Sequence, residues 1–373
     1  MNKTDSELIV SLRHELHAHP ELSEHEYETK ARLMSFLAEH TALKIVDRGA
    51  WFYAYYSSEN PELAPIAFRA DFDAVGVTEA NPTLSYRSCN EGVGHMCGHD
   101  GHSTALCAFA LELSRLRLNR DVYLIFQHAE ENGQGAKLCS ELIDEKGIAE
   151  IFAFHNCPGR PLGEVSVRKG CMDFASRGMI LSFLGKQAHA SRPEDGVNPA
   201  MAIAELIPEL DKIAAASSIE GLCMCTIVMI ELGEETFGIS AGSGRLLLTI
   251  RGEYESELDK LDIGVKTTAA IIARDENVEL RMEYRDVFPE TGCTPQSVDK
   301  LERLCHRLDI PFYELPEPQR GSEDFGWYTK RTHGAIFNIG SGRDHAGLHT
   351  ESFDYPDEIT PIAVRLMLGL TEN

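Results

Sequence analysis

A glycine-rich segment from Gly94 to Leu106 concentrates side chains that bind metal ions. It reads GHMCGHDGHSTAL and holds three of the chain's fifteen histidines together with a cysteine and an aspartate. Cys97 and His99 are two residues apart, and the glycines around them let the backbone bend closely around an ion. A thiolate and a neutral imidazole both suit a borderline-soft ion such as zinc. A single cysteine or histidine in such a loop is more often packed or hydrogen-bonded than a ligand, so a metal site needs further ligands from other segments.

The segment HAEEN supplies two adjacent carboxylates that a hydrolytic metal site can use. A dinuclear site needs several ligands close enough to share one water molecule, and one carboxylate left over to take a proton from that water. Glu130 and Glu131 can divide these two tasks, and His155 offers a further imidazole at the end of another apolar run. Each of them has a plainer interpretation, because adjacent glutamates usually lie on a solvated face and a lone histidine often belongs to the core.

Apolar runs predict the strands that bring these groups together. Strand patterns precede the polar residues in PIAFRAD (from 65), DVYLIFQHAE (from 121) and IAEIFAFHN (from 148), and a helical pattern, GHSTALCAFALELSRL, lies between the first two. Strands that alternate with helices form a parallel or mixed sheet covered on both faces. Functional residues gather beyond the carboxyl ends of such strands. We therefore expect Arg69, Asp71, Asp73, the glutamate pair and His155 at one edge of a sheet.

From about residue 176 the order of the predicted elements changes. Strand, helix, strand, strand, helix and strand patterns follow one another up to residue 289, which is the order of a ferredoxin-like unit with four antiparallel strands and two helices on one face. The later segment resembles the first domain in style. The sequence thus predicts an α/β protein with a discontinuous metal-binding catalytic domain at 1–175 and 290–373, built on a central mixed sheet flanked by helices, and an inserted ferredoxin-like α+β domain at 176–289.

Composition narrows the classes of partner. The chain has 35 lysines and arginines against 59 aspartates and glutamates, a formal net charge of −24, which repels phosphate backbones and anionic lipid surfaces. Nucleic acid and membranes are therefore poor candidate partners, and small molecules or metal cations fit better. The N-terminal sequence does not read as a signal peptide, and no apolar stretch is long enough to span a bilayer. The ten cysteines are scattered, so a reducing cytoplasm is the expected location.

Several motifs together resemble one known family, the dinuclear metallopeptidases that include aminoacylases and carboxypeptidases. The most similar branch is the amidohydrolase branch of aminoacylases, hippurate hydrolases and auxin-conjugate hydrolases. The resemblance spans nearly the whole chain in order, and the cysteine-containing loop with the glutamate pair is its specific signature. The motifs that carry it are LHAHPELSEHEYET (from 16), RADFDAV (from 69), GHMCGHDGHSTAL (from 94), FQHAEENGQGA (from 126), FHNCP (from 154), GKQAHASRPEDGVNP (from 185), GSEDFGWY (from 321) and LHTESFDYPDE (from 348).

This resemblance implies a centre of two divalent metal ions. Cys97 corresponds to a ligand between the ions, and His99, Glu131, His155 and His349 correspond to the ligands that complete the centre. Spacing alone does not single out His349, which lies far beyond His155 in the chain. The thiolate favours zinc, and manganese, cobalt or nickel are alternatives because carboxylate-rich dinuclear sites also take these ions.

The resemblance also implies roles outside the ligand set. Glu130 corresponds to the general base that activates a metal-bridging water and later donates a proton to the leaving amine. Asp71 and Asp100 correspond to groups behind the ligands that orient the imidazoles. His189 corresponds to a histidine that stabilises the developing oxyanion, often across a dimer. The inserted domain matches the family's lid and dimerisation domain, so a homodimer through this domain is expected.

Other residues of the same motifs are expected outside the metal centre. Arg69 carries a permanent cation, which cannot act as a ligand. His95 and His102 are expected to shape the loop or its hydrogen bonds. A redox role for Cys97 is disfavoured, because its nearest neighbouring cysteines form no C-x-x-C pair with it.

The implied activity is a metal-dependent hydrolase that cleaves the amide bond of N-acyl amino acids or related small conjugates. A dipeptidase or carboxypeptidase of the same family is an alternative, which differs in whether the acyl half carries a free amine. A metal-binding protein without turnover is a further alternative, supported by Gly238 and Gly242, which replace an asparagine and an aspartate of the family's lid strand. The retention of Glu130 argues against this last alternative, because a binding protein has no evident use for a base beside the ions.

Overall fold

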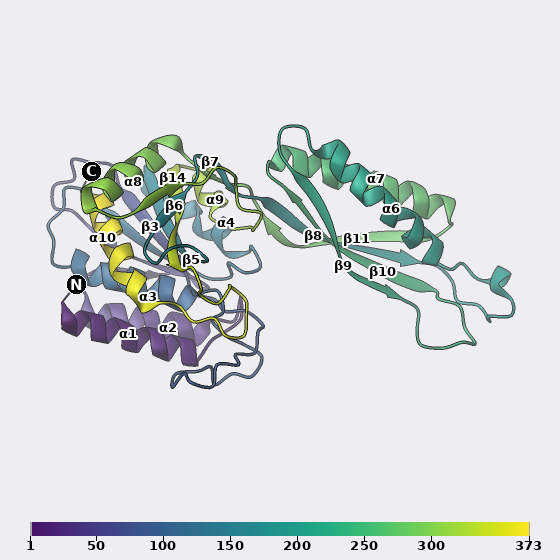
Figure 1. Ribbon diagram of the computed structural model, residues 1–373, viewed down its shortest axis with the longest axis horizontal. Coiled ribbons are helices and arrows are strands. Elements are labelled where there is room, and N and C mark those ends of the chain that lie inside the picture. Colours follow the sequence, from purple (N-terminus) through teal and green to yellow (C-terminus); the bar gives the residue numbers. More distant parts are fainter. Residues whose placement is uncertain (1, 373) are drawn as a thin grey trace. The chain divides into compact units, whose positions relative to one another are not determined.

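The computed structural model describes residues 2–372 and divides the chain into two compact units. The first unit comprises the chain up to Met172, the segment Thr291–Glu317 and the chain from Asp324 onward. The second unit comprises Asp173–Glu290 and Pro318–Glu323. Each unit has a hydrophobic core of its own, and Figure 1 colours both by sequence position.

The first unit is built on an eight-stranded mixed sheet. Strands β3, β4, β5 and β14 lie at its centre, where β3 pairs parallel with β4 and β5, and β5 pairs parallel with β14. Residues of β3 and β4 are buried along the whole strand, as expected for strands covered on both faces. In spatial order the sheet contains β1 (Lys44–Asp47), β2 (Phe52–Tyr56), β4 (Val122–Gln127), β3 (Ile66–Asp71), β5 (Glu150–Pro158), β14 (His333–Gly342), β6 (Val165–Val167) and β13 (Phe312–Glu314).

Helices flank this sheet, and one of them is buried on nearly every side. Every residue of α3 (His99–Leu113) except Glu112 is buried, because this helix packs among α1, α2 and α10 and against β3. A helix that is apolar around its whole circumference belongs to the interior. The other helices of this unit are α1 (Lys3–Ala18), α2 (Tyr27–His40), α4 (Gly135–Cys139), α5 (Glu141–Lys146), α8 (Pro295–Leu308), α9 (Gly326–Thr329) and α10 (Thr360–Thr371), with a 3-10 turn at Asp357–Ile359 and a short ribbon of β7 (Gly170–Asp173) and β12 (Thr291–Cys293).

The second unit is a four-stranded antiparallel sheet with two long helices. Its chain order of strand, helix, strand, strand, helix, strand is the predicted ferredoxin-like order. Residues of β10 alternate between buried and partly exposed, because α6 and α7 cover one face of the sheet only (Figure 1). The elements are β8 (Ala175–Leu184), α6 (Ala200–Ser217), β9 (Cys223–Leu232), β10 (Ser243–Gly252), α7 (Glu255–Asp275) and β11 (Glu279–Phe288), with a 3-10 turn at Pro193–Asp195.

The predicted fold class is confirmed, since a large mixed sheet flanked by helices accompanies a smaller α+β unit. The interpretation of the second unit as a lid or dimerisation domain stays a prediction. Among the described helices, none combines the length and the apolar character that a membrane crossing requires. All ten cysteines are free thiols.

Candidate metal centre

The predicted ligands of the first unit lie at the carboxyl-terminal edge of the central strands. β3 ends at Asp71, β4 ends two residues before the segment that carries Glu130 and Glu131, and β5 carries His155 near its end. His99 is the first residue of α3 rather than part of a loop. The helix begins there because Gly98 has a φ of +98°, and a Cβ at this glycine would lie 2.1 Å from Asn156 Oδ1.

Cys97 belongs to two groups of potential ligands at once. In the first group its Sγ lies with His99 and His155, and in the second it lies with Glu131 and His349; within each group the ligand atoms are at most 4.8 Å apart. The Sγ atom is 3.5 Å from His155 Nε2. The Cys97 sulfur therefore lies within reach of ligand atoms from both groups, and His99 and Glu131 are likewise each shared by more than one group.

The neighbours of His155 prepare its Nε2 atom as an electron-pair donor. Its Nδ1 lies 2.8 Å from the backbone oxygen of Asn156, so this nitrogen carries the proton and donates it. Nε2, which points at Cys97, is then unprotonated. Burial, followed by the nearby His102, lowers the pKa of His155 to about 3, which keeps the imidazole neutral as a ligand must be.

His349 comes from a distant loop whose backbone is held against the loop before α3. Its amide donates a hydrogen bond of 2.7 Å to the carbonyl oxygen of Met96, next to Cys97. Its φ of +59° is unusual for a residue with a Cβ, and such conformations cluster at functional sites. Its Nε2 lies 3.4 Å from Glu131 Oε1.

The two glutamates lie close to the Nε2 atom of His99. The Nε2 atom of His99 is 3.9 Å from Glu130 Oε2 and 3.7 Å from Glu131 Oε1. Ala129, the residue before them, has a φ of +48°, so the chain turns sharply after β4. The glutamate pair and the pair of Cys97 and His99 are thus brought together from two separate segments, as the expectation of a shared sheet edge requires.

Asp73, to which the sequence pattern gave no role, is the partner of the His99 imidazole. Its Oδ1 lies 3.0 Å from His99 Nδ1, and its Oδ2 accepts hydrogen bonds from Ser23 Oγ at 2.7 Å and from the Glu131 amide at 3.0 Å. A carboxylate on Nδ1 fixes the tautomer in which Nε2 is free to bind a metal. The sequence placed Asp73 at the predicted edge of the sheet, two residues after β3 ends at Asp71, but no local pattern pairs it with His99.

The two aspartates predicted behind the ligands have other partners. Asp71 Oδ1 lies 2.7 Å from His102 Nδ1 and Asp71 Oδ2 accepts a hydrogen bond from Arg69 Nη1 at 2.6 Å, whereas His99 Nε2 is 3.8 Å from Asp71 Oδ2. Asp100 Oδ2 lies 2.9 Å from His17 Nδ1. Asp100 therefore acts, in this structure, on a histidine of α1 rather than on a predicted ligand.

His95 and His102, expected to shape the loop, are both buried. His102 Nε2 lies 2.7 Å from Asn156 Oδ1, so this histidine links β3 to β5 through Asp71 and Asn156. His95 is 1% exposed, and burial lowers its pKa to about 4. Neither ring nitrogen of His95 has a hydrogen-bond partner within the described part of the chain.

Arg69 is buried, and its side chain joins β3, β4 and the segment before α9. Its guanidinium donates to Gln127 Oε1 at 2.8 Å, to Asp71 Oδ2, and to Asp324 Oδ1 at 2.8 Å. Gln127 Nε2 donates in turn to both oxygens of Asp324. This network fixes Asp71, and the guanidinium itself has no lone pair with which to bind a cation.

The electrostatics of the site favour cations. Burial opposes protonation of His99, but the carboxylates of Asp71 and Asp73 outweigh it and raise its pKa to about 10. Burial, followed by the charges of Glu131 and Glu130, raises the pKa of the Cys97 thiol well above its usual range. A metal ion that binds His99 and Cys97 displaces the protons on their ligand atoms, because a metal competes with protons for the same lone pairs.

Orphaned polar atoms provide the direct test of whether the residues fit a metal. His99 Nε2 and Glu131 Oε1 are buried, and neither makes a hydrogen bond among residues 2–372; the polar neighbour of Glu131 Oε1 is His349 Nε2, at 3.4 Å. Buried polar atoms without partners are rare and costly. These two atoms face one another beside Cys97, and sulfur, imidazole nitrogen and carboxylate oxygen are together a donor set for zinc or a related divalent ion.

His189, the residue predicted to stabilise the oxyanion, belongs to the second unit and not to the first. His189 lies in the second unit on an exposed segment, and its Nδ1 accepts a hydrogen bond from the Ser191 amide at 3.1 Å. Its predicted role therefore stays a prediction.

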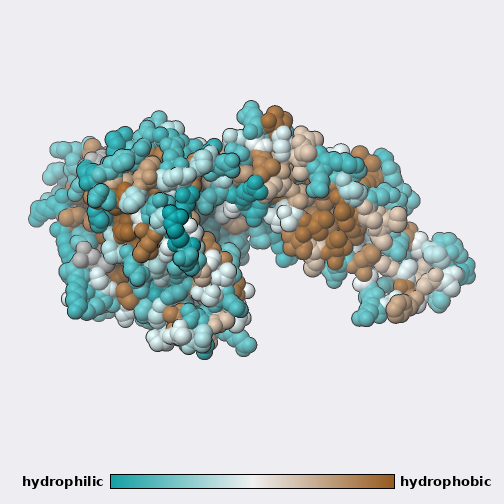
Figure 2. Space-filling view, viewed as in Figure 1, coloured by the Kyte–Doolittle hydropathy of each residue, from teal (hydrophilic) through white to brown (hydrophobic). Residues whose placement is uncertain are grey.

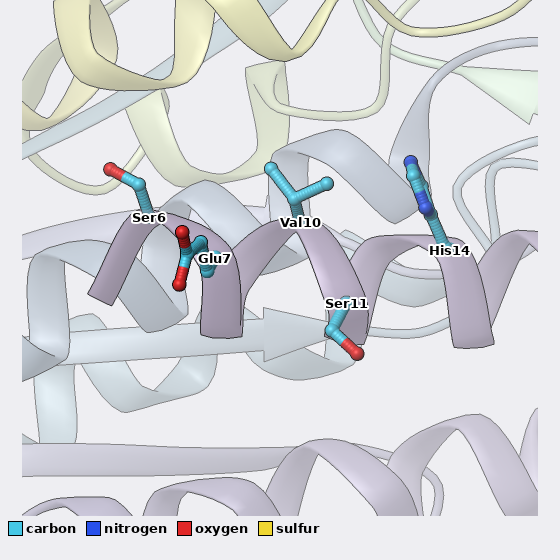
Figure 3. Close-up of a pocket in the computed structure, with 5 residues that line it drawn as sticks. All are labelled: Ser6, Glu7, Val10, Ser11 and His14. Carbon is cyan, nitrogen blue, oxygen red and sulfur yellow. The ribbon is translucent and has the colours of Figure 1, made fainter. Parts of the chain in front are cut away.

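A hollow beside α1 contains none of the candidate ligands; it is lined by Ser6, Glu7, Val10, Ser11 and His14 (Figure 3).

Comparisons with known proteins agree on one family. The model of peptidase family M20/M25/M40 matches residues 67–373. A hydrolase of uncharacterized activity from Staphylococcus haemolyticus is 28% identical over 371 residues, which are 95% of each chain, and an N-acetyldiaminopimelate deacetylase from Exiguobacterium sibiricum is 26% identical over 97% of this chain and 98% of its own. A dinuclear metal-binding peptidase of the M20 family from Bacillus subtilis shares the fold with a TM-score of 0.82 and 23% identity, over 99% of this chain and 98% of its own.

Proposed function

Because the chain belongs to peptidase family M20/M25/M40, we propose that it is a metal-dependent hydrolase that cleaves the amide bond of N-acyl amino acids or related small conjugates. The observation that carries this proposal is Cys97, which is shared by two groups of ligands beside a glutamate pair. A relative that covers nearly the whole chain is a deacetylase, whose substrate is an N-acylated amine.

Two divalent ions would be held by this chain's own side chains. Cys97, His99, His155, Glu131 and His349 are the residues that would hold them, since they form two groups of potential ligand atoms that both contain the Cys97 sulfur. When bound, the ions would polarise the amide carbonyl and lower the pKa of the attacking water. We favour zinc because of the thiolate, with manganese, cobalt or nickel as alternatives.

Glu130 is the proposed general base. Its carboxylate lies beside the ligand group, with Oε2 3.9 Å from His99 Nε2, and it is 6% exposed. It takes a proton from the water that attacks the carbonyl and returns a proton to the leaving amine. Because Glu131 is assigned to an ion, the adjacent pair divides into one ligand and one base.

His189 is proposed as the residue that stabilises the oxyanion of the tetrahedral intermediate. Its Nδ1 accepts the Ser191 amide and lies 2.8 Å from Ser191 Oγ, so Nε2 is the nitrogen that carries a proton when the imidazole is neutral. A donor aimed at the oxyanion contributes strongly to the rate of acyl transfer. Asp71 and Asp100 are proposed as supports of the site, Asp71 through His102 and Asp100 through His17.

A homodimer through the second unit is proposed from the edge strand β9. This strand ends the order of the sheet, and its outer residues are exposed and apolar: Val228 is 61% and Ile230 is 50% exposed. Figure 2 shows hydrophobic side chains gathered on this unit. An exposed apolar edge strand is a template for pairing with another copy.

The location and the partners follow from charge and thiol chemistry. We propose a cytoplasmic location, since all ten cysteines are free thiols. The net charge of −24 disfavours nucleic acid and anionic membranes as partners, which leaves small molecules.

The experiment that tests this function is a substrate panel on metal-reconstituted protein, read by mass spectrometry. The panel contains N-acyl amino acids, N-acetyl diamino acids and dipeptides. Release of free amine from the acylated compounds supports the proposal. Cleavage of dipeptides alone would favour the dipeptidase or carboxypeptidase alternative, which the peptidase family model supports. Two bound ions without hydrolysis of any amide would leave a metal-binding protein.

A further inference from the structure

We propose that Glu26 is a positioning residue for Glu130, because its carboxylate holds the backbone of Ala129 in the conformation that turns the chain from β4 into the glutamate pair. This inference rests on the proposed function, in which Glu130 is the general base. Glu26 lies in the loop that leads into α2, and it belongs to none of the groups of potential metal ligands.

Ala129 has a backbone conformation that its own side chain disfavours. Its φ is +48°, a left-handed value in which a Cβ crowds the following carbonyl, and the residue is fully buried. Such a conformation persists only where the surroundings determine it. The carbonyl oxygen of Ala129 accepts hydrogen bonds from the amides of Gln134 and Gly135, at 3.1 Å and 3.0 Å. These bonds close the turn from one side only.

Glu26 supplies the contact on the other side of Ala129. Its Oε1 accepts a hydrogen bond of 2.8 Å from the Ala129 amide, across a sequence separation of 103 residues. The amide and the carbonyl of Ala129 are therefore both held, and the direction in which the chain enters Glu130 is fixed. A displacement of this turn would change the distance between Glu130 and His99.

The N-terminal amides of α2 are capped by Glu21 and not by Glu26. Glu26 is the N-cap residue of α2, yet its side chain makes no capping hydrogen bond. Glu21 accepts the first free amides of this helix instead, from Thr29 at 2.7 Å and from Glu28 at 3.3 Å. Glu26 is left to reach Ala129.

The burial of Glu26 is unfavourable in itself, which argues for a purpose beyond stability. Glu26 is 5% exposed, and burial, followed by the charge of Asp73, raises its pKa to about 7. A buried carboxylate costs stability unless it is hydrogen-bonded. The same loop also contacts Asp73 through Ser23 Oγ, so it supports the partner of His99 as well as the turn before Glu130.

Four variants separate the hydrogen bond from the backbone conformation that it holds. Glu26→Ala removes the acceptor, and Glu26→Gln keeps an oxygen acceptor of the same length. Ala129→Gly removes the Cβ that disfavours a positive φ, so the turn no longer depends on an external contact. In the double variant Glu26→Ala/Ala129→Gly, the loss caused by the first change should therefore be largely recovered. Glu21→Ala is the matched control, because it removes a carboxylate from the same loop and only the cap of α2.

Activity and hydrogen exchange provide two independent readouts. Glu26→Ala should lower kcat roughly 10- to 100-fold with KM little changed, as expected for a small misplacement of a catalytic group. Amide exchange in the peptide that contains Ala129 and Gly135 should become faster in Glu26→Ala and return toward wild type in the double variant. Glu26→Gln should resemble wild type in both readouts. Glu21→Ala should lower the melting temperature and leave kcat and this exchange unchanged.

Several results would overturn the proposal. They are wild-type kcat and wild-type exchange in Glu26→Ala, no recovery in the double variant, or a loss in Glu26→Gln as large as that in Glu26→Ala. If Glu26→Ala does not fold, recovery of folding by Ala129→Gly supports the proposal and a second unfolded protein contradicts it. If the wild-type protein hydrolyses no amide, the proposed function fails, and the exchange data alone decide whether Glu26 holds the turn.

Discussion

The replacement Asp73→Asn tests how the candidate centre is held together. Asp73 accepts three hydrogen bonds: His99 Nδ1 lies 3.0 Å from Oδ1, and Ser23 Oγ and the Glu131 amide donate to Oδ2 at 2.7 Å and 3.0 Å. An asparagine offers one oxygen and one NH₂ group. Whichever way the amide is turned, its NH₂ faces at least one of these donors.

The arrangement of the three donors around Asp73 determines how much metal affinity Asp73→Asn should lose. If the NH₂ group faces His99, the imidazole is driven toward the tautomer with its proton on Nε2, which cannot bind a metal. If it faces the Glu131 amide, the segment that carries a proposed ligand is displaced. Loss of such a supporting group typically costs 10- to 100-fold in metal affinity, about 1.4–2.7 kcal/mol. The metal affinity of Asp73→Asn should therefore be about 10- to 100-fold lower than that of wild type for one or both ions.

The assay is a competition titration of metal-free protein with zinc against a chromophoric chelator. Asp47→Asn is the matched control, because Asp47 is half exposed, pairs with Lys30 and belongs to none of the groups of potential ligands. Ser23→Ala removes one of the three donors and should have a smaller effect than Asp73→Asn. Wild-type affinity at both ions in Asp73→Asn would refute the proposed role of this carboxylate.

Three further predictions concern pH and assembly. Burial opposes protonation of His17, but hydrogen bonds with Asp100 and Glu79 raise its pKa to about 9. The charged His17 therefore contributes its full stabilisation below its unfolded pKa of about 6.5, and this stabilisation is lost as the pH rises to about 9. Over this pH range the melting temperature of wild type should fall more than the melting temperature of His17→Gln. Zinc affinity should rise with pH because the Cys97 thiol and the His99 imidazolium must lose protons, and a pH-independent affinity would exclude them as ligands. Val228→Lys should convert a dimer into a monomer in light scattering, whereas Leu162→Lys should not, since Leu162 is an exposed apolar position on the first unit, with 54% exposure against 61% for Val228.

Local patterns in the sequence predicted the main elements of the fold. The apolar runs of β3, β4 and β5 are continuous because these strands are buried, and the alternation of β10 reflects a sheet covered on one face. The short strands β6, β7 and β12 were not predicted. Strands of three or four residues are too short for a periodic signal, and pairing with distant segments determines their conformation.

The site was predictable only where its residues are close in sequence or belong to a recognised motif. Adjacent Glu130 and Glu131 and the pair Cys97 and His99 could be read directly. The contact of Asp73 with His99 could not, because it joins the segment after β3 to the start of α3 across 26 positions. Asp100 illustrates the same limit, since its partner His17 lies on α1. A motif identifies residue types, whereas the fold decides which atoms meet.

The most direct test of the central claim compares wild type with Glu130→Gln in the same two measurements, metal content and amide hydrolysis. The change replaces a carboxylate by an amide of the same shape, which cannot accept the proton from water. Metal analysis should find two ions per chain in both proteins. On the best substrate of the panel, kcat of the variant should fall by about 10²- to 10⁴-fold, the contribution of a general base. Full activity in Glu130→Gln with both ions bound would contradict the account.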